Sequence, residues 1–247
     1  MKNYAVVQHS YAEFLGLIES HLERRDIGFS YFRPFVGQGL PGSAAQFDGL
    51  WLLGGAWPTA DAARNPQVPD ELRLIDIFRK ARRPVVGLGM GGLLVAQAAG
   101  GEATLSPDCT AGFVTARKTP AGEGDPLAEA VDGQQVLVMY HGNVVLPEGL
   151  EPILVDESGH WLAVRPDPLT YGLLFRPELK PGMLEDIIME PGHNPPPDIT
   201  ALLVQARDLW PRMQDMTARV VAALVTALGL MQERRKMPVF NLKLEPK

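Results

Sequence analysis

Residues 84–101 read PVVGLGMGGLLVAQAAGG and contain the strand-to-helix turn from which the rest of the sequence can be placed. Residues 84–87 predict a short buried strand, and residues 93–99 predict a helix that the glycine pair 100–101 closes. The glycines between them allow a tight reversal and let backbone N–H groups crowd around the central residue, Gly89. Because Gly89 carries no side chain, the local sequence favours a tight glycine turn, or an anion site at a helix N-terminus, over a nucleophile.

Short apolar strands alternate with helical patterns over the first hundred residues. The predicted strands cover 4–7, 29–32, 49–53 and 84–87, and the predicted helices cover 10–22, 70–82 and 93–99. The first helix is placed by Ser10 and Glu13, which have the spacing of a capping box. This alternation predicts an α/β fold with a parallel sheet and right-handed crossovers.

The pattern changes after residue 101. Short strand patterns at 112–116, 135–140, 152–155, 161–165 and 171–175 predict antiparallel hairpins added to one side of the sheet. Helical patterns follow at 199–210 and 213–235. The second of these is apolar nearly all round, which predicts a helix packed across the core, with a dimer or partner interface as the alternative.

Composition bounds the class of protein. The chain has 247 residues, a net charge of −6 and a single cysteine, Cys109. The charge argues against an electrostatic nucleic-acid binder, and the cysteine count excludes a disulfide framework or multi-cysteine metal centre. The longest apolar stretch, 220–231, is shorter than the roughly 20 residues that a membrane span needs, and the N-terminus lacks a signal-peptide pattern. We expect a cytoplasmic protein with no cofactor, no metal, and no nucleic-acid or membrane partner.

Four segments, in order, resemble class I glutamine amidotransferases. Residues 84–101 resemble that family's nucleophile segment, P-V-x-G-I-C-x-G-x-Q-x-L-A-x-x-x-G-G, and residues 47–55, FDGLWLLGG, resemble its oxyanion loop. Residues 141–147, HGNVVLP, resemble its H-G-D…L-P stretch, and residues 171–178, YGLLFRPE, resemble its Y-G-x-Q-F-H-P-E segment. The resemblance implies a flavodoxin-like domain over residues 1–190. Residues 191–247 would then be a helical extension packed on that domain or on a partner.

The departures from the family pattern decide the predicted function. The family's cysteine nucleophile falls on Gly89, its histidine base falls on Arg176, and only the orienting carboxylate, Glu178, is retained. Glycine cannot attack an amide, and an arginine stays protonated near neutral pH. The resemblance therefore implies a catalytically inactive protein that serves as a structural or regulatory subunit. Its expected partner is a synthetase-type enzyme or a second copy of itself, because the family normally supplies ammonia to a synthetase.

Two alternatives reuse the same pocket for other chemistry. An enzyme of a different reaction, or a small-molecule sensor, would use Arg176 to bind an anionic ligand. The implied binding residues are then the glycine pair Gly54 and Gly55, the Met90 amide, His141 and Arg176 itself. If Arg176 instead pairs with Glu178, the pocket is closed and a structural subunit is favoured; we expect this pair, because a buried unpaired arginine is costly.

Several other residues have simpler interpretations. We expect Cys109 to be structural, although it is the one candidate for a displaced nucleophile. His141 is expected to be a structural or pocket histidine, and Asp125 a solvated loop charge. Core packing is the expected role of Trp51 and Trp57, with pocket lining as the alternative. The basic segment 234–236 would close the last helix and suit its dipole.

Overall fold

The computed structural model describes residues 2–190 and 198–231 and consists of ten strands and seven α-helices over that part of the chain. The strands are β1 (Lys2–Val7), β2 (Ile27–Phe32), β3 (Gly49–Leu52), β4 (Val85–Leu88), β5 (Glu102–Thr115), β6 (Arg117–Lys118), β7 (Gln135–Val145), β8 (Leu154–Val155), β9 (Trp161–Asp167) and β10 (Thr170–Leu173). The helices are α1 (Leu17–Glu23), α2 (Val68–Lys80), α3 (Met90–Ala98), α4 (Pro126–Val131), α5 (Pro181–Met189), α6 (Ile199–Asp208) and α7 (Trp210–Leu228).

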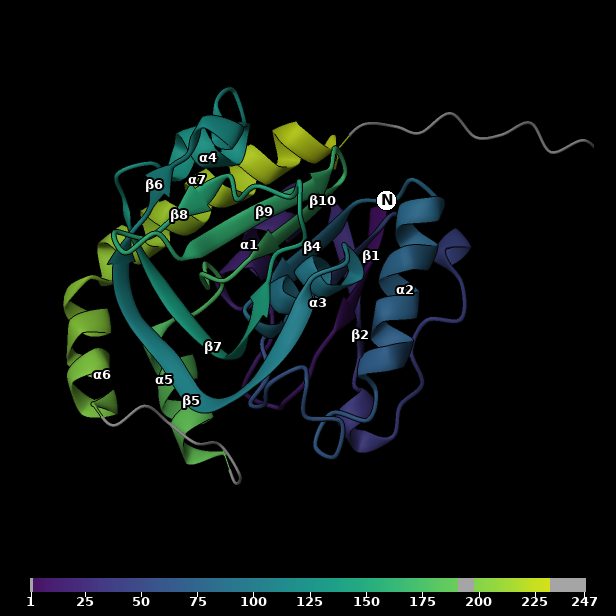
Figure 1. The fold of residues 1–247 in the computed structure, drawn as a ribbon, viewed down its shortest axis with the longest axis horizontal. Helices are drawn as coiled ribbons and strands as arrows, with labels where there is room; N and C mark the ends of the chain where they lie inside the picture. Colours follow the sequence, from purple (N-terminus) through teal and green to yellow (C-terminus); the bar gives the residue numbers. More distant parts are fainter. Residues whose placement is uncertain (1, 191–197, 232–247) are drawn as a thin grey trace, which may run out of the picture.

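Eight strands form one mostly parallel sheet with the order β2-β1-β3-β4-β10-β9-β8-β6. Strands β2, β1, β3, β4 and β10 run parallel, and β9, β8 and β6 extend the sheet in the antiparallel sense. The parallel core and its crossovers are as the sequence predicts. Antiparallel strands are added as predicted: β9 pairs with β8 and β10, and β5 pairs with β7. Two placements differ from the prediction. β10 also joins the parallel core beside β4, and β5 and β7 form a separate curved ribbon instead of extending the sheet (Figure 1).

Helices cover both faces of the sheet because alternate residues of its buried strands point in opposite directions. On one face, Ala5 and Val7 of β1 pack with α2 and α3. On the other, Tyr4 and Val6 of β1 pack with α1, α4 and α7. Each large apolar side chain that is fully buried in these layers stabilises the fold by about 1.5–3 kcal/mol. The result is a three-layer α/β/α arrangement.

The first helix begins later than the capping-box spacing predicts. Gly16, not Ser10, precedes α1, and its backbone has a φ of 50° that favours glycine. A side chain on Gly16 would overlap the carbonyl of Glu178 and the sulfur of Met183. Residues 10–16 are therefore held outside the helix, and Glu13 is free to turn into the protein.

Helices α4 and α5 were not predicted, although each begins with a proline in its first turn. The other predicted helices lie within a few residues of α2, α3, α6 and α7. The prediction that the last helix runs to residue 235 was wrong: α7 ends at Leu228, where Gly229 follows it with a left-handed backbone. The basic segment 234–236 lies outside the described residues. So does segment 191–197, which follows the predicted domain boundary; the division of the chain at residue 190 stays a prediction.

Helix α7 packs against the same core as the sheet. Its apolar residues Val220, Val221 and Leu224 are buried beside α1 and α4, and Thr217 donates a hydrogen bond to the Pro177 carbonyl at 2.5 Å. Figure 1 shows α7 running alongside α4. Within residues 2–190 and 198–231, no helix is long and apolar enough to cross a membrane.

Candidate functional site

Four loops at one edge of the parallel sheet bring the predicted site residues together. Gly54 follows β3, Gly89 follows β4, Arg176 follows β10, and Glu13 lies in the loop after β1. The carboxyl ends of these parallel strands meet at one edge, where open α/β sheets place their ligand sites. The predicted convergence of Gly54, Gly89 and Arg176 is therefore present in the fold.

Gly89 occupies a sharp turn between β4 and α3. Its φ is 55° and its ψ is −115°, and its amide donates a hydrogen bond to the Leu173 carbonyl at 2.8 Å. A side chain added here would meet Arg176 Cδ at 2.8 Å and the Met139 carbonyl at 3.2 Å. The turn retains the geometry of a nucleophile elbow, but Arg176 occupies the space into which a nucleophile would project.

Arg176 is buried between two carboxylates. Its Nε donates to Glu178 Oε1 at 2.5 Å, and its Nη1 lies 2.9 Å from Glu13 Oε1. Nη1 also donates to the Met139 carbonyl at 3.2 Å. All three charged side chains are at most 2% exposed. The predicted Arg176–Glu178 pair is thus present, and Glu13 supplies a second carboxylate; we call these three residues the Arg176 cluster.

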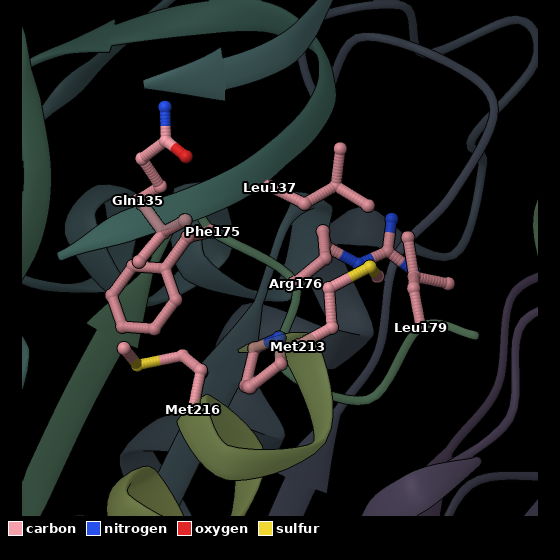
Figure 2. Close-up of a pocket in the computed structure, with 9 residues that line it drawn as sticks. Gln135, Leu137, Phe175, Arg176, Leu179, Met213 and Met216 are labelled. Atoms are coloured by element: carbon pink, nitrogen blue, oxygen red, sulfur yellow. The ribbon is translucent and has the colours of Figure 1, made fainter. Parts of the chain in front are cut away.

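Side chains fill the space beside Gly54 and Gly55, the glycine loop that follows β3. A Cβ on Gly54 would overlap the Glu13 carboxylate and both terminal nitrogens of Arg176, and a Cβ on Gly55 would overlap the sulfur of Met90. Figure 2 shows a cavity that Arg176 lines, together with Leu137, Leu179 and Met213 among others; its volume is about 20 Å³. A cavity of that size holds about one water molecule.

Burial and ion pairing act in opposite directions on the pKa values of Arg176 and Glu178. Burial raises the pKa of the Glu178 carboxyl above its usual value, although Arg176 opposes the shift. Burial by itself lowers the pKa of Arg176, but Glu178 and Glu13 outweigh it and hold that pKa above its usual value. Arg176 therefore stays protonated and cannot serve as a base. Its Nη2 and Glu178 Oε2 make no hydrogen bond within the described part of the chain.

A second buried ion pair, which the sequence analysis did not predict, lies beside the cluster. His9 Nδ1 is 2.8 Å from the Gly54 carbonyl, and its Nε2 is 3.2 Å from both carboxylate oxygens of Glu71. Both ring nitrogens face acceptors, so the ring is an imidazolium paired with Glu71. Burial by itself lowers the pKa of His9, but Glu71 and the Gly54 carbonyl raise it above its usual value. The sequence feature that could have predicted a site role for His9 is its position just after a buried strand.

The remaining predicted residues lie on the ribbon and on α3. His141 is 2% exposed on β7, directly opposite Cys109 of β5 and two residues after Met139. Burial raises the pKa of Cys109 to about 12, so its thiol stays protonated at neutral pH. Met90 begins α3, and its side chain covers Gly55.

Of three residues with simple interpretations, Asp125 and Trp57 have surroundings that differ from the expected ones, and Trp51 lies in the core as expected. Asp125 is buried, which corrects its interpretation as a solvated charge: its carboxylate accepts from Arg165 at 2.8 Å and Tyr171 at 2.7 Å, and it caps α4. Trp51 is 1% exposed in the core. Trp57 lines a pocket, and the Arg64 guanidinium lies 4.1 Å from its ring centroid.

Amide hydrolysis through an acyl-enzyme needs a nucleophile and a base, and three residues at or near this edge bear on that requirement. Gly89 offers no nucleophile, Arg176 cannot accept a proton, and the Cys109 thiol is held in its neutral form. Among residues 2–190 and 198–231, no group of three or more His, Cys, Asp or Glu side chains could hold a metal ion. The chemistry of this edge is that of buried, mutually paired charges.

Comparisons with known proteins agree with this architecture. No family model matches the chain. The glutamine amidotransferase-like protein YfeJ of Salmonella typhimurium is 31% identical over 164 residues, which cover 64% of this chain and 67% of that protein. A glutamine amido transferase structure from Methylobacillus flagellatus has a TM-score of 0.79 and 23% identity, covering 92% of this chain and 96% of its own. The structure of a proposed GMP synthase subunit from Thermoplasma acidophilum has a TM-score of 0.55 and 13% identity, covering 90% and 96%.

Proposed function

Because this chain belongs to the glutamine amidotransferase-like family, we propose that it is a member without glutaminase activity that acts as a structural or regulatory subunit. The observation that carries the proposal is the Arg176 cluster. Arg176 fills the space above Gly89, and Glu13 and Glu178 hold it there. Gly89 and Arg176 stand at the positions that resemble the family's nucleophile and base, and Arg176 forms a buried ion pair there.

Hydrolysis through an acyl-enzyme needs an attacking atom and a base within hydrogen-bond reach. The elbow position has no attacking atom, and the base position carries a permanent cation. The Met90 side chain also covers Gly55, whose amide belongs to the loop that resembles the family's oxyanion hole. Oxyanion donors without a nucleophile have no intermediate to stabilise.

The alternative use of this site, with Arg176 binding an anionic ligand in an enzyme or sensor, finds less support. Two carboxylates already contact the Arg176 guanidinium. An anionic ligand would have to displace a buried carboxylate, which would then lose its partner at a cost of several kcal/mol. The surroundings of Arg176 therefore favour a structural role.

Ammonia release from glutamine tests the catalytic part of the proposal. We expect no release above the uncatalysed background from the wild-type chain, with an active class I glutamine amidotransferase as positive control. The Cys109→Ser variant is the matched control for a displaced nucleophile, and it should behave like wild type. Turnover by the wild type that Cys109→Ser abolishes would overturn the proposal.

Two further variants separate the missing nucleophile from the missing base. Gly89→Cys alone should stay inactive, because Arg176 cannot accept the thiol proton and its side chain occupies the new sulfur's space. Adding Arg176→His to Gly89→Cys restores the family residues at both positions. Glutaminase activity in the single variant would show that Arg176 does not block the site, which contradicts the proposal.

The partner part of the proposal rests on the family and the fold. The Thermoplasma acidophilum structure, which shares this fold, is described as a proposed component of a GMP synthase. We propose that the partner here is likewise a synthetase-type enzyme that uses ammonia, met in the cytoplasm, with self-association as the alternative. Affinity purification from the native host tests this: a stoichiometric synthetase supports it, and recovery of this chain alone contradicts it.

A further inference from the structure

The strand order places a second crevice at the same edge of the sheet, two strands from Gly89. The chain passes from β1 outward to β2 and then back to β3 on the other side of β1. The connections after β1 and β3 therefore diverge, which makes β1/β3 the topological switch point of the sheet. Open α/β sheets bind ligands in the crevice at the carboxyl ends of such strands.

A pocket of about 320 Å³ opens at this switch point. That volume lies within the range of about 300–1,000 Å³ that small-molecule sites occupy. Four segments meet around it: the loop after β1, the turn after β2, the loop between β3 and α2, and the end of α5. We call it the switch-point pocket; the lining residues that matter below are His9, Phe35, Trp57, Arg64, Gln67 and Glu190.

Two partly exposed aromatic side chains, Trp57 and Phe35, line this pocket. Trp57 lies in the loop after β3, and the Arg64 guanidinium is stacked over its ring at 4.1 Å from the centroid. Phe35 follows β2, and its ring meets the Tyr11 ring edge-on with centroids 4.8 Å apart. Partly exposed rings inside a pocket offer stacking surface to a flat ligand.

Arg64 is the cation that an incoming ligand would meet. Its side chain is 57% exposed, and its ion pair with Asp61 at 3.3 Å is an i,i+3 contact at the surface. Exposed pairs of that kind contribute little free energy, so a ligand displaces Asp61 readily. The Trp57 indole beneath the Arg64 guanidinium fixes the plane of the guanidinium. The N–H donors of the guanidinium suit the two oxygens of a carboxylate.

The other two charged lining residues are already engaged. His9 is paired with Glu71, so the two side chains together add no net charge to the pocket wall. Glu190 Oε1 accepts a hydrogen bond from the Tyr11 amide at 3.0 Å. The neutral polar groups nearby are also paired in part: Asn65 donates to the Pro58 carbonyl at 2.8 Å. Arg64 is thus the charged group of the pocket that is most accessible to a ligand.

We propose that the switch-point pocket binds a small planar anion, an aromatic or heteroaromatic ring that carries a carboxylate. The ring stacks between the walls formed by Trp57 and Phe35, and the carboxylate accepts hydrogen bonds from Arg64. This inference goes beyond the subunit role proposed above. It does not depend on that role, because the pocket and the Arg176 cluster use different side chains.

Calorimetric titration with three probes tests the ligand class. Indole-3-carboxylate carries both the ring and the charge, indole-3-carboxamide carries the ring alone, and acetate carries the charge alone. We expect the carboxylate to bind. The carboxamide and acetate should each bind at least about tenfold more weakly, because a charge-assisted hydrogen bond or a stacked ring is lost.

Two matched arginine variants locate the site. Arg64→Gln should weaken indole-3-carboxylate binding by about tenfold or more. Arg73→Gln should leave it unchanged, since Arg73 is 74% exposed and has a similar i,i+3 pair with Asp70 at 3.4 Å. Three results would each overturn the proposal: equal binding of indole-3-carboxylate and indole-3-carboxamide, no binding of indole-3-carboxylate at millimolar concentration, or unchanged binding by Arg64→Gln. Glutaminase assays are not involved, so its failure would leave the proposed subunit role standing.

Discussion

The Arg176 cluster and the switch-point pocket lie at the same edge of one sheet, and each presents an arginine. Arg176 is 2% exposed and paired with two buried carboxylates, whereas the side chain of Arg64 is 57% exposed and paired with one surface carboxylate. The cavity beside Arg176 has a volume of about 20 Å³, whereas the switch-point pocket has a volume of about 320 Å³. The comparison shows that two arginines at one edge of a sheet differ in what they present to solvent: Arg176 is enclosed by its buried partners, and Arg64 is accessible.

The two sites also share a connection. His9 lines the switch-point pocket, and its Nδ1 contacts the carbonyl of Gly54, the glycine covered by the Arg176 cluster. Glu71 of α2 completes the pair with His9. The loop that contains Gly54 therefore lies between two buried ion pairs, His9–Glu71 on one side and the Arg176 cluster on the other. The predictions below test whether the two arginines differ as this arrangement requires.

The largest effect is expected from removing Arg176. Arg176→Ala leaves Glu13 and Glu178 buried without their cation, so the free energy of unfolding should fall by about 3–5 kcal/mol. Urea denaturation measures the loss. Arg73→Ala, a change at an exposed arginine, should stay within about 0.5 kcal/mol of wild type. An unchanged stability of Arg176→Ala, together with lost binding of an anionic metabolite, would favour the sensor or enzyme alternative at that site.

Gly54→Ala should have the next largest effect. The new methyl group would overlap the Glu13 carboxylate and the Arg176 guanidinium, and overpacking of this kind costs about 1–3 kcal/mol. Gly42→Ala is the control, because Gly42 is exposed and a Cβ there meets nothing within 4 Å. Thermal unfolding compares the two. Equal melting temperatures would mean that the cluster does not press on the glycine loop.

A pH-dependent effect is expected at His9. Its pKa is raised in the folded protein, so the stabilisation by its ion pair is fully present below the unfolded value of about 6.5 and is lost as pH rises through the folded value. His9→Gln should remove that part of the pH dependence, because the side chain that titrates is gone. His160→Gln, at a 73% exposed histidine paired with Asp156, should not. A wild-type stability that is flat above pH 6.5 would contradict the buried pair.

The sequence predicted the parallel core well because its strands are short, fully buried and separated by glycine turns. Strands β1, β3 and β4 each lie within two residues of their predicted positions. The strands after residue 101 were harder to place, because a short apolar strand reads the same in a hairpin, a ribbon or a parallel sheet. β10 belongs to the parallel core only through its pairing with β4, which is a contact between residues about 85 positions apart.

The site was predicted in part for a similar reason. The motif spacing located Gly54, Gly89, Arg176 and Glu178, which the fold brings together. Glu13 was missed because its spacing from Ser10 matched a capping box. The structure keeps the contact, since Ser10 Oγ donates to Glu13 Oε2 at 3.1 Å, but Gly16 keeps both residues outside the helix. Glu13 takes part both in the local contact with Ser10 and in the long-range ion pair with Arg176, and only the tertiary contact to Arg176 shows its second role.

The smallest effect on stability is expected from Arg64→Gln, and it completes the comparison with Arg176. Arg64 makes one exposed ion pair, so its loss should change the free energy of unfolding by less than about 0.5 kcal/mol. The stacking on Trp57 adds at most about 1 kcal/mol at an exposed site, part of which the glutamine side chain retains by packing on the indole. Urea denaturation of Arg64→Gln beside Arg176→Ala, at one pH and salt concentration, gives both values directly. A loss above about 2 kcal/mol for Arg64→Gln would place that arginine among the structural charges, because a group that holds the fold together is not available to a ligand.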